Sequence, residues 1–236
     1  MFNKKTFIKS TTYRIYSSLV TFITSLILTG DIVLSASIGI VDSTFKIFTY
    51  YFFDVVWLKF TKVKYRKTVI FLTGLSGAGK TTIAKLLFEK LQKLGEPAMI
   101  LDGDEIREIF KTTGFDKKSR DEHVKNVGRT AAFLQRRGTI AIVSMIAPYS
   151  EVRKECRDMS TDFTEVYVNT SLTVCENRDV KGLYKKARAG EIKSFTGIHD
   201  DAPYEVPVNP DIILDTTVMT VDECVDTILT DLKRQC

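Results

Sequence analysis

Two long apolar stretches open the chain and predict a pair of helices. The first covers residues 11–29 and carries only the charge of Arg14, and the second covers residues 32–58, with Gly30-Asp31 between them. Both reach the length of about 20 residues that a membrane-spanning helix needs. Lysine and arginine residues precede the first stretch and follow the second, which favours a cytoplasmic location for both flanks. The pattern therefore predicts a transmembrane helical hairpin in a multi-pass arrangement, with both termini cytoplasmic.

Other interpretations of this region stay open. The two helices also fit a soluble hairpin packed on the rest of the chain. A pair lying flat on a membrane is disfavoured because neither stretch is strongly amphipathic. A cleaved signal peptide is excluded because the apolar region is too long and is doubled. Asp42 and Lys46 interrupt the second stretch four residues apart, so they share a helical face and can pair with each other.

From residue 68 onward, short apolar runs alternate with helical periodicity. Five runs predict buried strands over residues 68–73, 98–101, 139–146, 163–168 and 212–214. Helical patterns separate or follow them, including residues 82–91, 150–159 and 220–234, and a periodicity that resumes at Val124. Strands that alternate with helices predict an α/β fold with a mostly parallel, doubly wound sheet flanked by helices.

The positive charge of the chain is concentrated in its N-terminal part. The net charge is +5, but residues 1–67 hold ten Lys or Arg against three Asp, whereas residues 68–236 hold 24 basic and 26 acidic residues. The second part is thus nearly neutral and lacks the basic surface of a nucleic-acid-binding domain. We therefore expect no nucleic-acid partner, and the basic residues near the apolar stretches fit membrane flanks.

A glycine-rich loop lies between the first expected strand and the helix after it. Its sequence is Gly74-Leu75-Ser76-Gly77-Ala78-Gly79-Lys80-Thr81. In this context the G-x-x-x-x-G-K-[ST] pattern binds phosphates through backbone N–H groups and the helix N-terminus. Lys80 should reach the β- and γ-phosphates, and the Thr81 hydroxyl should ligate Mg²⁺. A turn that binds nothing is a weak alternative to a P-loop of the NTPase type, although the motif leaves the acceptor open.

Asp102-Gly103-Asp104 ends the strand over residues 98–101, at the sheet edge where α/β proteins hold ligands. Two carboxylates at this place suit a magnesium site or a base that orients an acceptor hydroxyl. A plain turn or a helix cap explains the same residues about as well. Asp104 can also cap the helix that follows.

A basic stretch over residues 175–190 follows the strand at residues 163–168 and contains Gly182 and Gly190. In a P-loop kinase, a mobile basic lid closes over the phosphates at such a place. For a charge run taken alone, a solvated helix is the more frequent explanation.

Together, these residues resemble an adenylylsulfate kinase (APS kinase). The likeness covers about residues 68–236, and the lid is its most specific part. It rests on residues 74–81, Asp102-Gly103-Asp104 with Arg107, Gly114-Phe115, Arg120, Ile146-Ala147-Pro148-Tyr149, residues 181–193, residues 195–198, Pro203-Tyr204-Glu205 and Pro207. The resemblance implies ATP-dependent phosphorylation of the 3′-hydroxyl of adenosine 5′-phosphosulfate (APS), which gives 3′-phosphoadenosine 5′-phosphosulfate (PAPS) and ADP with Mg²⁺ as cofactor.

The resemblance also implies residue roles. Lys80, Asp102 and Asp104 would be catalytic, and Thr81 and Asp102 would hold the metal. Arg178 and Lys181 would join residues 74–81 in binding ATP. The acceptor would be bound by Asp104, Arg107, Phe115, Arg120, His123, Ile146, Ala147, Lys181, Leu183 and Phe195.

Several positions depart from the family pattern. Ala147 stands where many members carry a serine proposed as a phosphorylated intermediate, which excludes a phosphoserine route at that site. His123 replaces a common asparagine and Ser150 a common arginine, and both changes bear on the acceptor contacts. Two alternatives therefore stay open: a P-loop kinase of another nucleotide or small metabolite, and an inactive nucleotide-binding scaffold for sulfate-activation enzymes.

The N-terminal part resembles a small, uncharacterised family of two-helix bacterial membrane proteins. The likeness covers about residues 5–60 and implies no activity. We expect a two-helix membrane anchor over residues 1–64 and an APS kinase domain over residues 65–236, held at the cytoplasmic face of a bacterial inner membrane. Because the kinase family is commonly dimeric, a homodimer is expected, with ATP sulfurylase or a sulfotransferase as candidate protein partners.

Overall fold

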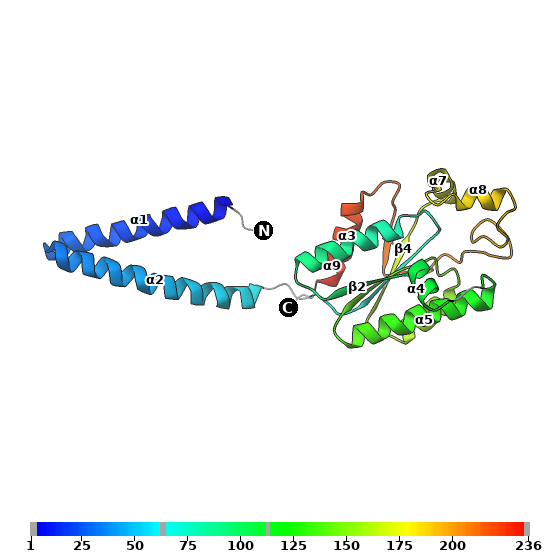
Figure 1. Ribbon diagram of the computed structural model, residues 1–236, viewed down its shortest axis with the longest axis horizontal. Coiled ribbons are helices and arrows are strands. Elements are labelled where there is room, and N and C mark those ends of the chain that lie inside the picture. The colour runs from blue at the N-terminus through cyan, green and yellow to red at the C-terminus, as the bar shows by residue number, and fades with distance from the viewer. Residues whose placement is uncertain (1–3, 62–64, 112–113, 234–236) are drawn as a thin grey trace. The chain divides into compact units, whose positions relative to one another are not determined.

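The computed structural model describes residues 4–61, 65–111 and 114–233, with side chains over residues 16–46, 65–111 and 114–233. The chain divides into two compact units, Met1–Val63 and Lys64–Cys236 (Figure 1). Each unit is described by itself.

The first unit is a helical hairpin of α1, Lys4–Thr29, and α2, Ile32–Thr61 (Figure 1). Gly30 makes the turn with a φ of 68°, a conformation that glycine adopts without strain. The Asp31 carboxylate then accepts hydrogen bonds from the backbone N–H groups of Val33 and Leu34, at 2.8 and 3.1 Å. Asp31 therefore caps the start of α2.

Several hydroxyl side chains lie between the two helices, whereas many large apolar side chains are exposed. The Ser18 and Ser43 hydroxyls are 3.0 Å apart, and those of Thr29 and Ser35 are 3.1 Å apart. Ser35 is fully buried, whereas Leu28 is 80% exposed. This distribution is the reverse of a water-soluble hairpin, in which the apolar side chains face each other.

Asp42 and Lys46 form the ion pair expected from their spacing, at 2.6 Å. The Lys46 ammonium also donates to the Ser17 hydroxyl of α1 at 2.9 Å. The pair thus contributes to the polar seam between the helices.

Among the described residues, no helix has both the length and the apolar character required to cross a bilayer. The expected transmembrane pair is therefore not confirmed.

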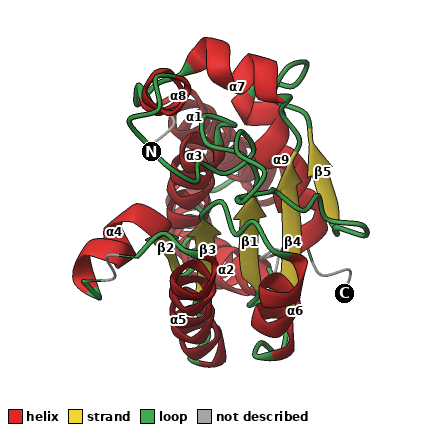
Figure 2. Ribbon diagram, turned by 90° about the vertical axis from the view of Figure 1, so that its right-hand side faces the viewer, coloured by secondary structure: helices red, strands yellow, loops and turns green. Residues whose placement is uncertain are grey.

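The second unit is built on a five-stranded parallel sheet, whose strands lie side by side in Figure 2. Its order is β2-β3-β1-β4-β5, with β1 Val69–Thr73, β2 Ala98–Asp102, β3 Ile140–Ser144, β4 Phe163–Val168 and β5 Ile212–Leu214. Ser144 pairs with Leu72 on one side and with Asp102 on the other. The loops after β1, β2 and β3 therefore start at the same edge of the sheet. The α/β fold with a parallel sheet is confirmed.

Helices cover both faces of the sheet (Figure 2). On one face lie α3, Lys80–Lys93, and α9, Val221–Leu232, and on the other lie α5, Lys117–Arg136, and α6, Ser150–Asp158. Ile70 and Leu72 of β1 belong to the core on the α3 and α9 side, whereas Val69 and Phe71 belong to the core on the α5 and α6 side. All four are at most 1% exposed, which explains the uninterrupted apolar run of this strand.

Three short helices lie near the carboxyl edge of the sheet: α4, Gly103–Ile109, α7, Leu172–Arg178, and α8, Leu183–Arg188. The start of α5 differs from the prediction, because the helix begins at Lys117 rather than near Val124. The Asp116 carboxylate accepts a hydrogen bond from the Ser119 backbone N–H at 3.1 Å and caps the charged first turns.

Two close contacts fix the edges of this unit. Tyr65 forms an antiparallel bridge with Lys233, and the Arg66 guanidinium pairs with Asp162 at 2.9 Å. Residues 65 and 66 therefore belong to the folded second unit. Helices α5 and α6 also pack closely: a Cβ atom on Gly128 would lie 2.5 Å from the Cys156 sulfur, so this approach requires glycine at position 128.

Candidate active site

The glycine-rich loop connects β1 to α3 and has the geometry of a phosphate cradle. A Cβ atom on Gly74 would lie 2.7 Å from the Val168 carbonyl oxygen of β4, so only glycine fits there. Gly79 has a φ of 101° and immediately precedes α3. The loop thus directs its backbone toward the N-terminus of α3, where anions bind favourably.

Lys80 is folded back onto this loop. Its ammonium donates to the carbonyl oxygens of Gly74 at 2.9 Å and Leu75 at 2.7 Å. The side chain is buried, and burial lowers the pKa of Lys80 to about 8. Nearby Asp102 and Asp104 act in the opposite direction. The loop lysine therefore lies where phosphates would bind, close to both carboxylates.

The Thr81 hydroxyl lies 3.1 Å from a carboxylate oxygen of Asp102 and 3.2 Å from the Ser144 hydroxyl. Hydroxyl and carboxylate oxygens are the ligands that Mg²⁺ prefers. Within the described part of the chain, no group of three or more His, Cys, Asp or Glu side chains is arranged to hold a metal ion. The donors at this place fit Mg²⁺, which takes most of its ligands from phosphates and water in such sites.

Asp102 and Asp104 have different environments. Asp102, rather than Asp104, caps α4, because its carboxylate accepts the Asp104 backbone N–H at 3.0 Å. Asp102 is the last residue of β2, so its extended backbone can turn the side chain back onto the helix. The Asp104 carboxylate is exposed and forms an ion pair with the Lys181 ammonium at 2.5 Å. A lid residue and a sheet-edge carboxylate thus meet beside the P-loop.

Two arginines organise the neighbouring surface. The Arg107 guanidinium lies 4.7 Å from the centre of the Phe115 ring and donates to the Gly114 carbonyl oxygen at 2.9 Å. The Arg120 guanidinium is buried and donates to the Phe115 carbonyl oxygen at 2.6 Å and to the Thr196 hydroxyl at 2.5 Å. It also donates to the Ser194 carbonyl oxygen. Arg120 therefore joins α5 to residues 194–196.

His123 is buried beneath the same surface. One ring nitrogen, Nε2, lies 2.9 Å from the Gly103 carbonyl oxygen, whereas Nδ1 has no hydrogen-bond partner among the described residues. Burial lowers the pKa of His123, and the nearby Arg107 charge lowers it further. A carbonyl oxygen only accepts, so Nε2 carries the proton and Nδ1 presents a free lone pair.

Ile146 and Ala147 follow β3. The Ile146 carbonyl oxygen accepts from the Thr73 hydroxyl at 2.6 Å. Ala147 is buried and has a φ of 45°, and its carbonyl oxygen accepts from the Arg153 guanidinium at 2.7 Å. Their backbones are therefore fixed against β1 and α6, and Ala147 presents no hydroxyl.

The predicted lid residues lie on α7, on α8 and in the loops after them. The Arg178 guanidinium donates to the hydroxyl and to the carbonyl oxygen of Thr216, both at 2.9 Å, beside the P-loop. Leu183 begins α8, directly after Gly182, which has a φ of 65°. The Phe195 ring packs edge-on against the Tyr184 ring, with centroids 5.0 Å apart.

The sequence did not single out Ser144, Thr216 or Tyr184 as site residues. The Ser144 hydroxyl contacts the Thr81 hydroxyl. The Thr216 hydroxyl donates to the Ala78 carbonyl oxygen, and the Tyr184 hydroxyl donates to the Ser76 carbonyl oxygen. Ser144 lay inside the expected strand over residues 139–146 and Tyr184 inside the expected lid, but neither side chain was given a role.

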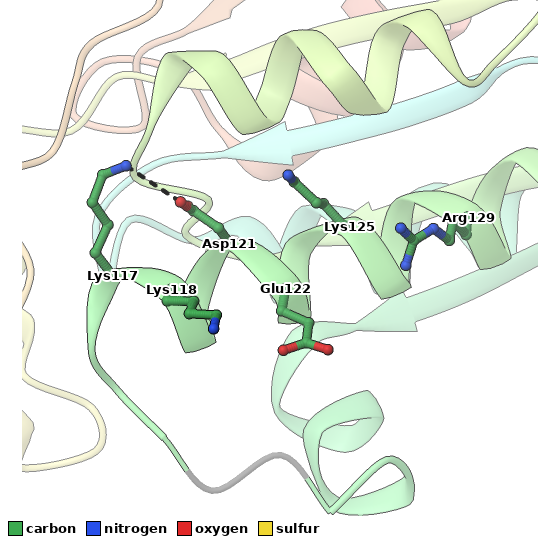
Figure 3. Close-up of a pocket in the computed structure, with 6 residues that line it drawn as sticks. All are labelled: Lys117, Lys118, Asp121, Glu122, Lys125 and Arg129. Carbon is green, nitrogen blue, oxygen red and sulfur yellow. Dashed lines mark hydrogen bonds and ion pairs between the residues drawn. The ribbon is translucent and has the colours of Figure 1, made fainter.

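A separate charged hollow lies along the exposed side of α5 (Figure 3). Its lining residues are Lys117, Lys118, Asp121, Glu122, Lys125 and Arg129. None of these residues belongs to the predicted site. Lys117 pairs with Asp121 at 3.4 Å, and Lys125 pairs with Glu155 of α6 at 2.9 Å. The hollow is therefore a solvated surface of ion pairs.

Comparison with known proteins gives two family matches. A family described as Adenylylsulphate kinase matches residues 66–215, and one described as Predicted membrane protein (DUF2061) matches residues 7–58.

Individual relatives cover the same region. The chain is 51% identical over 173 residues to the adenylyl-sulfate kinase of Gloeothece citriformis, which covers 73% of this chain and 97% of that protein. The solved APS kinase of Mycobacterium tuberculosis, in complex with AMPPNP and APS, is 40% identical with a TM-score of 0.67, covering 72% of this chain and 98% of that one. A hexameric APS kinase from Thiobacillus denitrificans is 31% identical with a TM-score of 0.52, covering 70% of this chain and 28% of that one.

Proposed function

The chain belongs to the adenylylsulphate kinase family, and we propose that it is a membrane-associated member of that family. Like its relatives, it is a kinase that uses ATP to phosphorylate APS, which gives PAPS and ADP. One observation carries the residue roles: Lys80, the Thr81–Asp102 pair and the Asp104–Lys181 ion pair lie together at the carboxyl edge of the sheet.

Residues 74–81 are proposed to hold the ATP phosphates. The loop backbone and the N-terminus of α3 supply N–H groups, and Lys80 supplies a positive charge at the β- and γ-phosphates. Arg178, which is bound to Thr216 beside the loop, would lie near the adenine. Lys181 would reach the phosphates from the lid.

Thr81 and Asp102 would hold Mg²⁺ through their hydroxyl and carboxylate oxygens. The bound ion would neutralise charge on the β- and γ-phosphates. Ser144, which contacts Thr81, would orient the threonine hydroxyl.

The acceptor is proposed to bind between the lid and α4–α5. Arg107 and Arg120 would favour its anionic phosphosulfate group, and Phe115 and Phe195 offer rings for the adenine. The remaining proposed contacts come from Asp104, His123, Ile146, Ala147, Lys181 and Leu183. Asp104 is assigned to the 3′-hydroxyl because its carboxylate is exposed next to the loop lysine.

The chemical step is proposed to be a direct in-line transfer. The bond from the γ-phosphorus to the β–γ bridging oxygen breaks and leaves its electron pair on ADP, while the 3′-oxygen of APS forms the new bond. The hydroxyl proton passes to the Asp104 carboxylate. Positioning and charge neutralisation by Lys80 and Lys181 supply most of the rate enhancement. Ala147 provides no oxygen for a phosphoenzyme.

Residues 1–64 are proposed to form a membrane anchor and residues 65–236 the kinase domain. The exposed apolar side chains of residues 16–46 and the hydroxyls buried between α1 and α2 support an apolar environment for the hairpin. A transmembrane hairpin at a bacterial inner membrane, with both termini and the kinase in the cytoplasm, stays our prediction. A homodimer, and partnership with ATP sulfurylase or a sulfotransferase, stay predictions as well.

The test uses purified full-length protein, ATP labelled at the γ-phosphate, and APS. Label should appear in PAPS, with none retained on the protein. Adenosine 5′-monophosphate, which lacks the sulfate, is the control acceptor. Equal turnover of the control would defeat the sulfate-specific assignment, and retained label would defeat direct transfer.

A further inference from the structure

Tyr184 of the lid contacts both substrate sites at once. The side chain is 2% exposed, and its hydroxyl donates to the Ser76 carbonyl oxygen of the P-loop at 2.9 Å. Its ring packs edge-on against Phe195, which is proposed to hold the acceptor base. Tyr184 therefore bridges the P-loop and the ring of Phe195.

The hydroxyl contact acts on a specific peptide plane. The Ser76 carbonyl and the Gly77 N–H belong to one planar trans peptide, so they point in opposite directions. A donor that holds the Ser76 oxygen outward therefore holds the Gly77 N–H inward, toward the phosphate cradle. Gly77 has a φ of 74° and lacks a side chain to fix this plane by itself.

A second contact connects the P-loop to the acceptor side. A Cβ atom on Gly197 would lie 2.8 Å from a methyl carbon of Leu75, so the loop after Phe195 packs directly on the P-loop. Arg120 holds the same loop through Ser194 and Thr196. Residues 194–197 and residue 75 are thus in direct packing contact, so a shift of one segment would press on the other.

We propose that the Tyr184 hydroxyl couples the two substrate sites, so that APS bound against Phe195 tightens nucleotide binding by fixing the Gly77 N–H. The inference rests on the proposed roles of the P-loop and Phe195. Tyr184 is a positioning residue here, because it acts on ATP through the Ser76–Gly77 peptide. Burial raises the pKa of Tyr184 well above its ordinary value, so the hydroxyl remains a donor throughout the working pH range.

A purely structural role for Tyr184 makes a different prediction. If Tyr184 only filled the core, loss of its hydroxyl would lower the stability of the protein but would leave the coupling between the APS and nucleotide sites unchanged. Tyr184→Phe keeps the ring and the Phe195 contact and removes only the hydroxyl. Tyr204→Phe is the control, because it likewise removes a tyrosine hydroxyl that is hydrogen-bonded, here to the Thr73 hydroxyl at 3.0 Å, outside the lid. The Tyr184 hydroxyl also interacts with the Cys175 thiol.

The experiment measures the dissociation constant of AMPPNP with Mg²⁺ by titration calorimetry, without APS and with saturating APS, on the full-length protein. The ratio of the two constants is the coupling factor. For the wild type we expect a factor of about five or more, within the usual range of coupling between sites. Tyr184→Phe should bring the coupling factor close to one. Tyr204→Phe should leave the coupling factor unchanged, although it should lower the melting temperature about as much as Tyr184→Phe does.

The outcomes separate this inference from the proposed function. A wild-type factor of one, or a wild-type factor retained in Tyr184→Phe, overturns the coupling even if APS is turned over normally. A factor lost equally in Tyr204→Phe also overturns it, because any weakened tyrosine contact would then suffice. If APS neither binds nor becomes phosphorylated in the wild type, the proposed function itself fails.

Discussion

The Lys181 ammonium binds the Asp104 carboxylate, which connects the lid to the first turn of α4. Asp104 is the carboxylate proposed to receive the proton of the acceptor hydroxyl. In that proposal the acceptor hydroxyl and the Lys181 ammonium share one exposed carboxylate, so a change at either residue should alter the phosphoryl-transfer step.

The first prediction concerns this ion pair. Asp104→Asn should lower kcat by about a thousandfold, because the amide cannot accept the proton, with ATP binding nearly intact. Lys181→Met should lower kcat by about a hundredfold, because a charge near the transferring group is lost. The measurement is steady-state kinetics with both substrates varied.

Both side chains are largely exposed, so neither substitution should move the melting temperature appreciably. The double variant should lose less than the product of the two single effects, because the residues act on one step. Fully independent effects would show that the two residues do not share that step.

The second prediction concerns pH. Lys80 has a pKa lowered to about 8 by burial, so it is charged below this pH and becomes neutral as the pH rises through it. Bound phosphates favour the charged form. Nucleotide affinity should therefore fall above pH 8, by at most about tenfold per pH unit, and binding there should take up a proton. Calorimetry at pH 8.5 in two buffers of different ionisation enthalpy measures this uptake.

Lys80→Met provides the control for the pH effect. It should bind the nucleotide weakly, with little dependence on pH between 7 and 9. Kinetically, Lys80→Ala should lower kcat by orders of magnitude, because a charge opposite the transferring phosphoryl group is lost. Proton uptake that persists in Lys80→Met would assign the titration to another group.

The third prediction concerns Arg120. Arg120→Ala removes a buried cation that holds three protein oxygens, which should raise KM for APS by tenfold or more and lower the free energy of unfolding by about 3 kcal/mol. Kinetics and urea unfolding measure the two effects. Thr196→Val removes one partner of the guanidinium and leaves the charge. If Arg120 acts partly by positioning residues 194–196, Thr196→Val should also raise KM for APS; an unchanged KM would leave direct contact as its whole role.

The fourth prediction concerns the boundary between the two units. A chain that begins at Tyr65 should be soluble and should keep kcat within about twofold of the full-length value, because it retains the contacts of residues 65 and 66. A chain that begins at Val69 loses the Tyr65 bridge and the pairs of Arg66 with Asp162 and Asp231. It should melt several degrees lower. Equal melting temperatures would show that these contacts contribute little.

The fifth prediction concerns topology. If the hairpin crosses the membrane, reporters fused at residue 31 and at the C-terminus should lie on opposite sides of it. Reporters on the same side would favour a hairpin that does not cross. The control exchanges Asp42 and Lys46, which keeps composition and pairing and should preserve the topology.

Strands β1 and β3 were predictable because every one of their residues is buried, which requires an almost uninterrupted apolar run. Strands β2 and β5 lie at the two edges of the sheet and are partly exposed, but their short apolar runs still indicated them. The start of α5 was missed because its first turns are charged, and only the Asp116 cap reveals them. Either Asp102 or Asp104 could cap α4. The backbone conformation decides between them, and the sequence Asp-Gly-Asp does not determine that conformation.

The site was predictable where motif residues are close in the sequence, as in residues 74–81. Contacts between distant segments were not. Arg120 was expected to face the acceptor, but its partners at Ser194 and Thr196 lie more than 70 residues later. Tyr184 was counted only as part of a basic lid, because nothing local indicates that its hydroxyl reaches Ser76.

The close approach of α5 and α6 at Gly128 also means that the reactivity of the Cys156 thiol depends on whether these two helices stay together. Cys156 is fully buried at this contact, and burial raises the pKa of its thiol to about 12. A thiolate is the reactive species, so an alkylating reagent labels this cysteine only after the helices separate. In a Cys236→Ser background, the labelling rate of Cys156 therefore measures how often the helix that carries Arg120 and His123 leaves its place, and how far each substrate suppresses that opening.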